Sequence, residues 1–478
     1  MNLKKYQLYW GELHTHTYCG SKFGTLEDAV EIAKTQLDFW APGEHNNRTD
    51  IPHPDYNWPE IVRIAKQYNQ PGKFIVFPGF EYAVADGDYN AYFCNDEVPE
   101  FRPKSFDELF SFVRKNNGIL IPHHTGYKVG CRGTDWNNFQ PGLMPVVEIF
   151  SMHGSSESED GYFPMSLPKM GPRATAGTAQ AGLIRGLKFG FIASTDGHYG
   201  YPGSYKMGLT GVYAEGLSRE SIWLAILARR TFAVSGDRIK VRFDINSHLM
   251  GEEVVYSGKE RVISAEVEAL DSLDKIEIIK NNKILYRASP MVGYQPSPGK
   301  TGKYKVRIEW GWGGEQIIKW DGKLEIKAGE LISFSPCFGP PAPNKVVSFS
   351  NNHCCWLSHT QGSSVYNWKL CRNGREGTNS IVFEFVGGND TVFNIELNNQ
   401  KFQYSLAQLK EGSQIGLMKG SFNEKIKIYS PVPEKLYSIK LKVIDKLAEQ
   451  ETDFYYLRVF QANGQMAWSS PVWITKKV

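Results

Sequence analysis

The stretch LYWGELHTHTYCG, residues 8–20, is an apolar run that ends in two histidines, His14 and His16, separated by one residue. On a β-strand, residues i and i+2 point to the same side, so the two imidazoles are expected to face one spot. Neutral imidazoles that converge on one point are typical ligands of divalent transition metals. An H-x-H pair by itself is more often solvated or packed than ligated, so the rest of the sequence has to decide between these alternatives.

The composition is that of an ordinary globular protein, since 41% of the residues are hydrophobic and 22% are charged. A length of 478 residues predicts about three domains, or two large ones. The net charge of +3 is too small to indicate a nucleic acid or a membrane surface as a partner. No apolar run approaches the roughly 20 residues of a transmembrane span, and no segment has the pattern of a signal peptide. We therefore expect a cytoplasmic protein, or a chain already trimmed of its signal.

The first half of the sequence alternates short apolar runs with helical patterns. Thr25 is the predicted N-cap of one helix, and Ser105 with Glu108 forms a predicted capping box at the start of another. Strands that alternate with helices at this spacing predict βαβ units and a parallel sheet. Helices are predicted within residues 25–37, 57–69, 105–118, 178–190 and 218–238, and strands within residues 8–16, 39–45, 74–82, 119–124, 146–151 and 191–198.

From about residue 240 the segments alternate in the manner of β-strands. Asn281-Asn282 and Asn463-Gly464 stand between alternating runs and indicate hairpin turns. The predicted organisation is therefore an α/β region over residues 1–240 and a β-rich region over residues 241–478, with one or two antiparallel sandwich modules.

Each strand expected in the first half ends on a polar residue that can bind a metal ion. Of the eight histidines before residue 240, seven lie at such ends, and His53 is the exception. In a parallel α/β barrel the carboxyl ends of the strands meet on one face, where active sites are built. The pattern therefore predicts a metal centre. The strand-end residues are His14, His16, Glu44, His45, Glu81, His123, His124, Glu148, His153, Asp196 and His198.

Five short motifs occur in a fixed order along the chain. They are GELHTHT, the GEH run, GFEY, IPHHTG and STDGH. With them the sequence resembles the polymerase and histidinol phosphatase (PHP) superfamily of metal-dependent hydrolases. It is most similar to an uncharacterised branch in which a PHP barrel precedes a β-rich tail, with GLSRESIWLAILARRTFAVSGDRI and YYLRVFQANGQMAWSSPVWI as shared blocks. The resemblance implies a distorted (β/α)7 TIM-like barrel over residues 1–240, holding two or three divalent ions of manganese, iron or zinc.

The resemblance also implies a ligand set. His14, His16, Glu81 and Asp196 would hold one ion, and Glu81 would bridge it to a second ion. The second ion is shared with His123, although the sequence does not fix whether His123 or the adjacent His124 is the ligand, and we favour His123. A third ion would be served by His45 and His198.

Two departures from the family pattern bear on these ions. The family usually has an acidic or histidine ligand shortly after H-x-H, whereas TYCGSKFG, residues 17–24, has no carboxylate. The third ion would then be weak or absent, or Cys19 would serve as a soft ligand. The branch usually has a histidine after Glu81, where DGDYNAYF offers Asp88 and Asn90, so the second ion keeps a ligand there only if Asp88 takes that place. Oxygen ligands would mildly favour manganese or iron over zinc.

The resemblance leads to a mechanistic hypothesis, the hydrolysis of a small phosphorylated substrate. Metal ions about 3.5–4 Å apart that share a carboxylate can lower the pKa of a bridging water and hold it as hydroxide. His153 or His124 would protonate the leaving oxygen, and a satisfied core histidine is the other interpretation of His153. Lys128 and Arg132 follow a ligand strand and are candidates for binding a substrate anion, or else form a solvated pair on a loop.

Two other functions stay open beside the phosphoesterase. The near-neutral charge leaves room for a hydrolase or lyase that acts on a carbohydrate-type substrate. Tryptophans in IEWGWGGEQIIKW, residues 308–320, invite a sugar-stacking interpretation, although most tryptophans in β modules pack in the core. A non-catalytic scaffold whose β modules bind a partner is the third possibility, and the near-complete ligand set argues against it.

Overall fold

The computed structural model describes residues 5–17, 24–47, 57–166, 170–198, 200–295, 301–362, 377–420 and 423–477. Cys19 and His53, which the sequence singled out, lie outside the described residues. The helices of the first half are α1 (Leu26–Lys34), α2 (Trp58–Tyr68), α3 (Phe106–Lys115), α4 (Ala179–Ile184) and α5 (Arg219–Leu227), with short 3-10 turns at Trp136–Asn138 and Thr175–Gly177.

The predicted caps set where these helices begin. Thr25 accepts the backbone N–H of Asp28, and the Asp28 carboxylate accepts the N–H of Thr25 in return, so α1 starts with a full capping box. Ser105 accepts the N–H of Glu108 at α3, as predicted. In a full capping box the Glu108 carboxylate would accept the N–H of Ser105. Here it accepts the N–H of the preceding residue, Lys104, at 2.9 Å.

Short parallel strands lead toward the predicted site residues. β1 (Gln7–Glu12), β2 (Phe39–Trp40) and β3 (Ile75–Val76) pair in parallel, as expected from helices that connect successive strands. β7 (Val146–Ser151) likewise pairs in parallel with β9 (Gly190–Ala193). The remaining strands nearby are β8 (Gly154–Ser155), β10 (Leu209–Ala214) and β11 (Thr231–Val234).

Several strands of the first half were not predicted. Of these, β10 pairs in antiparallel fashion with β1 and with β11, and β11 lies within residues 218–238, which were predicted to be helical, because α5 ends at Leu227. Another unpredicted strand runs against both of its neighbours. β4 (Gly79–Val84) and β6 (Ile119–His123) both pair in antiparallel fashion with β5 (Gly87–Tyr92), which lies between them. Only Ala85 and Asp86 separate β4 from β5, and so short a connection can join only antiparallel strands. β4 and β6 therefore run in the same direction.

The strands of the second half form sheets with antiparallel hairpins. Asn281 and Asn282 have φ angles of 48° and 64°, the left-handed conformation of the predicted hairpin turn between β16 and β17. One sheet contains β14 (Glu253–Tyr256), β16 (Leu273–Lys280), β17 (Lys283–Ala288), β28 (Thr452–Gln461), β29 (Met466–Ser469) and β30 (Val472–Lys476). A second contains β12 (Lys240–Ile245), β13 (His248–Leu249), β15 (Arg261–Glu268) and β27 (Ser438–Asp445).

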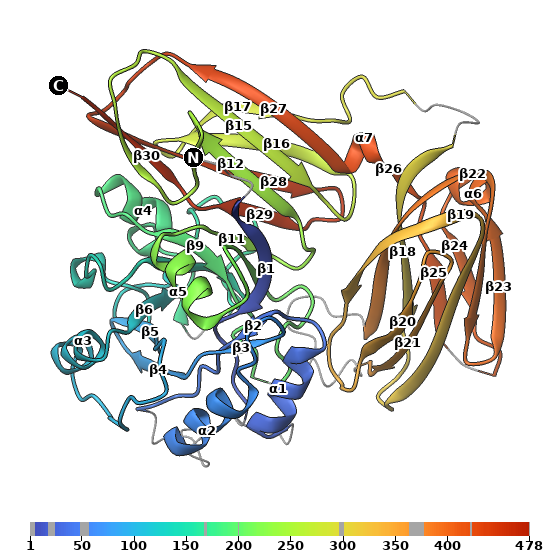
Figure 1. Cartoon of the computed structure of the whole chain (residues 1–478), viewed down its shortest axis with the longest axis horizontal. Helices are drawn as coiled ribbons and strands as arrows, with labels where there is room; N and C mark the ends of the chain where they lie inside the picture. The colour runs from blue at the N-terminus through green and yellow to red at the C-terminus, as the bar shows by residue number, and fades with distance from the viewer. Residues whose placement is uncertain are drawn as a thin grey trace.

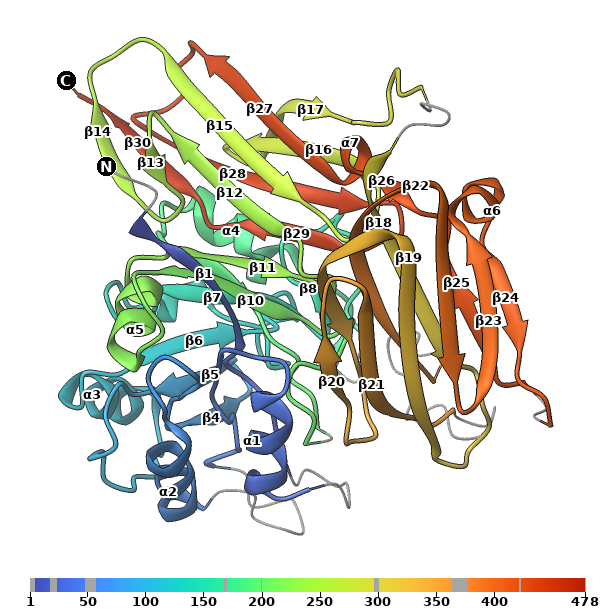
Figure 2. The same ribbon diagram turned by 45° about the vertical axis from the view of Figure 1, so that its right-hand side comes forward.

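A further sheet lies to one side of these strands, with two short helices, α6 (Leu406–Glu411) and α7 (Glu434–Tyr437), nearby. Figures 1 and 2 both show its strands as a separate body beside the strands of the first half. Its members are β18 (Gly302–Gly311), β19 (Ile318–Cys337), β20 (Lys345–Phe349), β21 (His353–Thr360), β22 (Thr378–Leu397), β23 (Gln400–Ser405), β24 (Gln414–Leu417), β25 (Lys425–Ile428) and β26 (Val432–Pro433).

Two tryptophans that invited a sugar-stacking interpretation lie in the core of this body. Trp310 and Trp320 are 0% and 1% exposed, and their indole N–H groups donate to Ser358 and Thr360. Rings so covered have no open face for a sugar, and their role is packing.

The first and second halves are joined by backbone pairing and by a buried ion pair. β29 pairs with β11, so residues near the end of the described chain extend the sheet that contains β1. Asp237 accepts two hydrogen bonds from Arg307, at 2.8 and 2.9 Å, and further ones from Gln461 and Asn463. Among the described helices, none is long and apolar enough to cross a membrane.

Candidate metal centre

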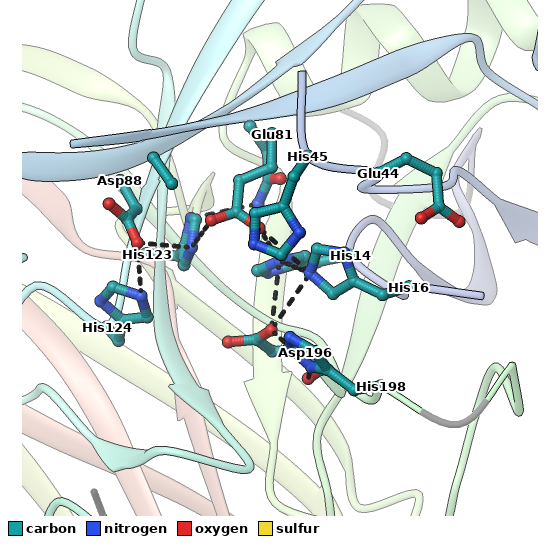
Figure 3. Close-up of polar contacts among 12 residues, drawn as sticks. His14, His16, Glu44, His45, Glu81, Asp88, His123, His124, Asp196 and His198 are labelled. Atoms are coloured by element: carbon teal, nitrogen blue, oxygen red, sulfur yellow. Dashed lines mark hydrogen bonds and ion pairs between the residues drawn. The ribbon is translucent and has the colours of Figure 1, made fainter. Parts of the chain in front are cut away.

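The strand ends of the first half bring imidazoles and carboxylates together in one buried cluster (Figure 3). The cluster residues that are at most 5% exposed are His14, His16, His45, Glu81, Asp88, His123, His124, His153 and Asp196. The His198 side chain is 31% exposed and forms the outer edge. Glu44 also lies at a strand end, but it accepts the N–H and the hydroxyl of Thr17, at 2.9 and 2.6 Å, and points away from the cluster.

The first candidate ion position lies between four ligand atoms. The Nε2 atoms of His14 and His16 are 3.2 Å apart. Glu81 Oε2 is 3.5 and 3.0 Å from these two nitrogens, and Asp196 Oδ1 is 3.4 Å from each. Two imidazole nitrogens and two carboxylate oxygens at this spacing suit a divalent ion with mixed nitrogen and oxygen ligands.

The orientation of His14 supports this fit. Its Nδ1 lies 3.1 Å from Glu148 Oε2, so Nδ1–H donates a hydrogen bond to the carboxylate and Nε2 is directed at the cluster. A second nitrogen, that of His16, faces this Nε2, and two facing lone pairs are stable only with a proton or a cation between them. The residues present therefore fit a metal ion.

A second set of ligand atoms adjoins the other oxygen of Glu81 through His123. Oε1 of Glu81 lies 3.4 Å from His123 Nε2. Asp88 lies opposite His123 in the pairing of β5 with β6, and its Oδ2 is 3.9 Å from His123 Nε2 and 3.0 Å from His124 Nε2. Asp88, His123 and His124 form one set that could hold an ion, and both histidines belong to it.

A third set contains imidazoles alone. The ring of His16 lies 4.4 Å from that of His45 and 4.3 Å from that of His198, measured between centroids. The three side chains place one nitrogen each within 4.8 Å of one another. Residues 17–24, where the family usually has a further ligand, lie largely outside the described residues. Within the described residues this set consists of three histidines.

His153 joins a set that was not foreseen. Its Nε2 lies 2.9 Å from Asp196 Oδ2, and it forms a candidate ligand set with Asp196 and His124. The hydroxyl of Tyr127 lies 3.0 Å from His153 Nδ1. Tyr127 is 0% exposed and was not predicted, because a tyrosine four residues after the end of a strand carries no signal of its own.

Burial and neighbouring charges set the protonation of the cluster. Burial opposes ionisation of Glu81 and of Asp196, but the surrounding imidazoles outweigh it and hold both pKa values well below the usual range. Burial also opposes a charge on His14, yet Asp196 and Glu148 raise its pKa to about 10, so without an ion Nε2 carries a proton that a bound metal ion would displace. Burial and the neighbouring His14 lower the pKa of His123 to about 3, so His123 is neutral, the state in which an imidazole binds a metal.

The two predicted substrate-binding residues are placed differently. Lys128 is exposed on the loop after β6. Arg132 reaches into the cluster, where its Nη2 lies 3.2 Å from Glu81 Oε1 and forms an ion pair with Asp88 Oδ2. Arg132 therefore contacts two of the predicted ligands.

Comparisons with known proteins identify relatives whose roles are not established. The model of a family of proteins of unknown function (DUF3604) matches residues 203–261. An uncharacterized protein of Chlamydia pneumoniae is 27% identical over 307 residues, and one of Chlamydia trachomatis serovar D is 28% identical over 315 residues. Each match covers 59% of this chain and 49% of the relative, so the chain spans about half the length of the curated relatives it matches.

Among solved structures, similarity is found to a two-domain protein from Bacteroides vulgatus, described as containing a predicted PHP-like metal-dependent phosphoesterase. The alignment covers 58% of this chain and 81% of that chain, with 17% sequence identity and a TM-score of 0.36. Similarity at this level supports no conclusion about the fold or the activity of this chain. The candidate metal centre therefore stands on its own geometry.

Proposed function

We propose that the chain is a metal-dependent hydrolase, a phosphoesterase that acts on a small anionic substrate. One observation carries the proposal, the convergence of two carboxylates on one pair of imidazoles. The Nε2 atoms of His14 and His16 are 3.2 Å apart, and Glu81 Oε2 and Asp196 Oδ1 each lie 3.0–3.5 Å from both. We further propose that the parallel strands of the first half close into a distorted TIM-like barrel of the PHP type. The shared direction of β4 and β6 and the parallel pairs β1–β2–β3 and β7–β9 support that arrangement.

Two or three divalent ions are proposed, because the five candidate ligand sets overlap and cannot all be filled at once. Their ligands are imidazoles and carboxylates, which suit manganese, iron and zinc. When bound, such ions activate a water for attack and neutralise charge on a phosphoryl group. Glu148 orients His14 for this role, and the side-chain amide of Asn90, 3.2 Å from Nδ1 of His123, orients that ring.

The leaving oxygen needs a proton, and we propose His124 as its donor. His153 has both ring nitrogens engaged, one by Tyr127 and the other by Asp196, so it is better suited to positioning or to binding an ion. Among the described residues, Nδ1 of His124 has no hydrogen-bond partner, whereas Asp88 holds its Nε2 at 3.0 Å. A ring held at one nitrogen and open at the other is suited to proton transfer.

The proposal is tested with purified protein, a generic aryl phosphate and an aryl glycoside, after loading with manganese, iron or zinc. Wild type is expected to hydrolyse the phosphate, and His14→Ala and Asp196→Ala are expected to lower the rate by at least about 100-fold. His248→Ala is the matched control, since that histidine pairs with Glu252 outside the cluster. Metal binding without phosphatase activity, or cleavage of the glycoside alone, would contradict the proposed substrate class, and a protein that takes up no metal would contradict the proposed chemistry.

A further inference from the structure

Arg132 places a permanent positive charge inside the candidate metal centre. Its guanidinium lies 3.2 Å from Glu81 Oε1 and pairs with Asp88 Oδ2. These two carboxylates face the same space as His123 and His124. An arginine guanidinium is charged at any working pH, so this side chain brings a fixed positive charge to the two carboxylates.

The backbone around Arg132 is shaped to direct this side chain inward. Arg132 has a φ angle of 69°, a left-handed conformation that a residue with a large side chain rarely adopts. Its N–H donates to the Ala85 carbonyl at 2.7 Å, which ties the loop to the turn between β4 and β5. A Cβ atom on the next residue, Gly133, would overlap the Tyr127 carbonyl, so the close approach of the loop to itself requires glycine there. Strain of this kind is typical of functional sites, where the surrounding structure holds it in place.

Asp88, predicted as a substitute metal ligand, has both oxygens engaged by the protein. Oδ1 accepts the backbone N–H of Val84 at 3.0 Å. Oδ2 pairs with Arg132 and lies 3.0 Å from His124 Nε2. A carboxylate that is 0% exposed needs a compensating positive charge, and Arg132 supplies it.

From these contacts we infer that Arg132 is a built-in cation that occupies the Asp88–His123–His124 set, so that this set binds no metal ion while the arginine is present. This inference rests on the proposed metal centre. Asp88 is then the anchor of Arg132 and contributes no ligand to an ion. The neighbouring sets around His14 and around His198 remain available for metal.

Metal stoichiometry tests the inference without any measurement of activity. The full chain is loaded with Mn²⁺, freed of excess metal, and its manganese content per chain is measured by plasma mass spectrometry. Arg132→Gln is expected to bind about one more ion than wild type, because it leaves a buried carboxylate and two imidazoles without a cation. Lys128→Gln is the matched control, since it removes the same charge from an exposed position of the same loop and should leave the content unchanged.

Two further variants keep the test decisive if Arg132→Gln does not fold. Asp88→Asn is expected to keep the wild-type number of ions, whereas a drop of about one ion would make Asp88 a ligand and overturn the inference. Arg132→Gln combined with Asp88→Asn is expected to lose the additional ion. Equal metal content in wild type and folded Arg132→Gln also overturns the inference. A wild type that binds Mn²⁺ but hydrolyses no phosphate ester would overturn the proposed function and leave this result standing.

Discussion

Nδ1 of His14 and Oε2 of Glu148 lie 3.1 Å apart, and both side chains are almost fully buried. The contact joins a histidine that follows β1 to a carboxylate in the middle of β7. It fixes the ring so that Nε2 faces Glu81 and Asp196, and it raises the basicity of that nitrogen. Glu148 thus acts on a bound ion through His14.

Glu148→Gln is expected to weaken binding of the first metal ion by about 10–100-fold, because the amide orients the ring less firmly and adds no negative charge. The number of ions bound at saturating metal should stay as in wild type. Competition with a metallochromic chelator measures the affinity. Glu252→Gln, which alters a histidine–glutamate pair at the surface, is the control. If Glu148→Gln binds metal as tightly as wild type does, Glu148 does not position His14 for metal binding.

His45→Ala and His198→Ala are each expected to remove one ion and leave the ion at His14 in place. The His16–His45–His198 set has no carboxylate, so the loss of one imidazole leaves too few ligands. Metal content per chain and its dependence on metal concentration measure the effect. If both variants keep the full wild-type content, this set does not hold an ion.

Arg307→Met is expected to lower the free energy of unfolding by about 3–5 kcal/mol, because it leaves the buried carboxylate of Asp237 without its cation. Urea denaturation followed by tryptophan fluorescence measures the change. Asp237→Asn combined with Arg307→Met should recover part of the loss, since both charges are then absent. A loss below about 1 kcal/mol would mean that the pair does not stabilise the junction between the two halves.

Glu268 is expected to make the free energy of unfolding depend on pH in the acidic range. Burial opposes its ionisation, but Lys305 and Lys240 outweigh that effect and lower its pKa to about 2. The pKa is thus lower in the folded than in the unfolded chain, where it is about 4.3. The stabilisation from this carboxylate is fully present above the unfolded pKa of about 4.3. It is lost as the pH falls from there to the folded pKa of about 2.

Glu268→Gln should therefore show a smaller loss of stability than wild type between pH 5 and about 2.5, together with a lower stability at neutral pH. Urea midpoints measured at several pH values provide the comparison. Glu266→Gln is the matched control, because Glu266 lies on the same strand and pairs with an exposed lysine. Parallel curves for wild type and Glu268→Gln would contradict the assigned contribution.

Much of the candidate site follows from the sequence, because strand-end position is a local property. His14 and His16 sit two residues apart after an apolar strand, and that spacing alone predicts rings on one side. The hairpin at Asn281-Asn282 is predictable for a similar reason, since only a few residues tolerate its left-handed turn.

Contacts that depend on loop geometry could not be predicted, although Arg132 itself was a candidate for binding a substrate anion. Arg132 enters the cluster only because its backbone adopts a positive φ and its loop is tied to the turn at Ala85. Tyr127 and His153 come from the segments that follow β6 and β7, and no periodicity indicates that they meet. β5 escaped prediction because Gly87, Asp88 and Asn90 are residue types that are depleted in strands, although polar and apolar residues alternate along it.

The pairing of β11 with β29 has a consequence for biosynthesis. Phe232 lies opposite Ser469, so the edge of the β1 sheet stays without its neighbour until the ribosome has polymerised more than two hundred further residues. Contacts of such long sequence separation form late and slow folding. The nascent chain consequently spends that interval with an open sheet edge, and chaperones that shield exposed strands are expected to influence its yield in the cell.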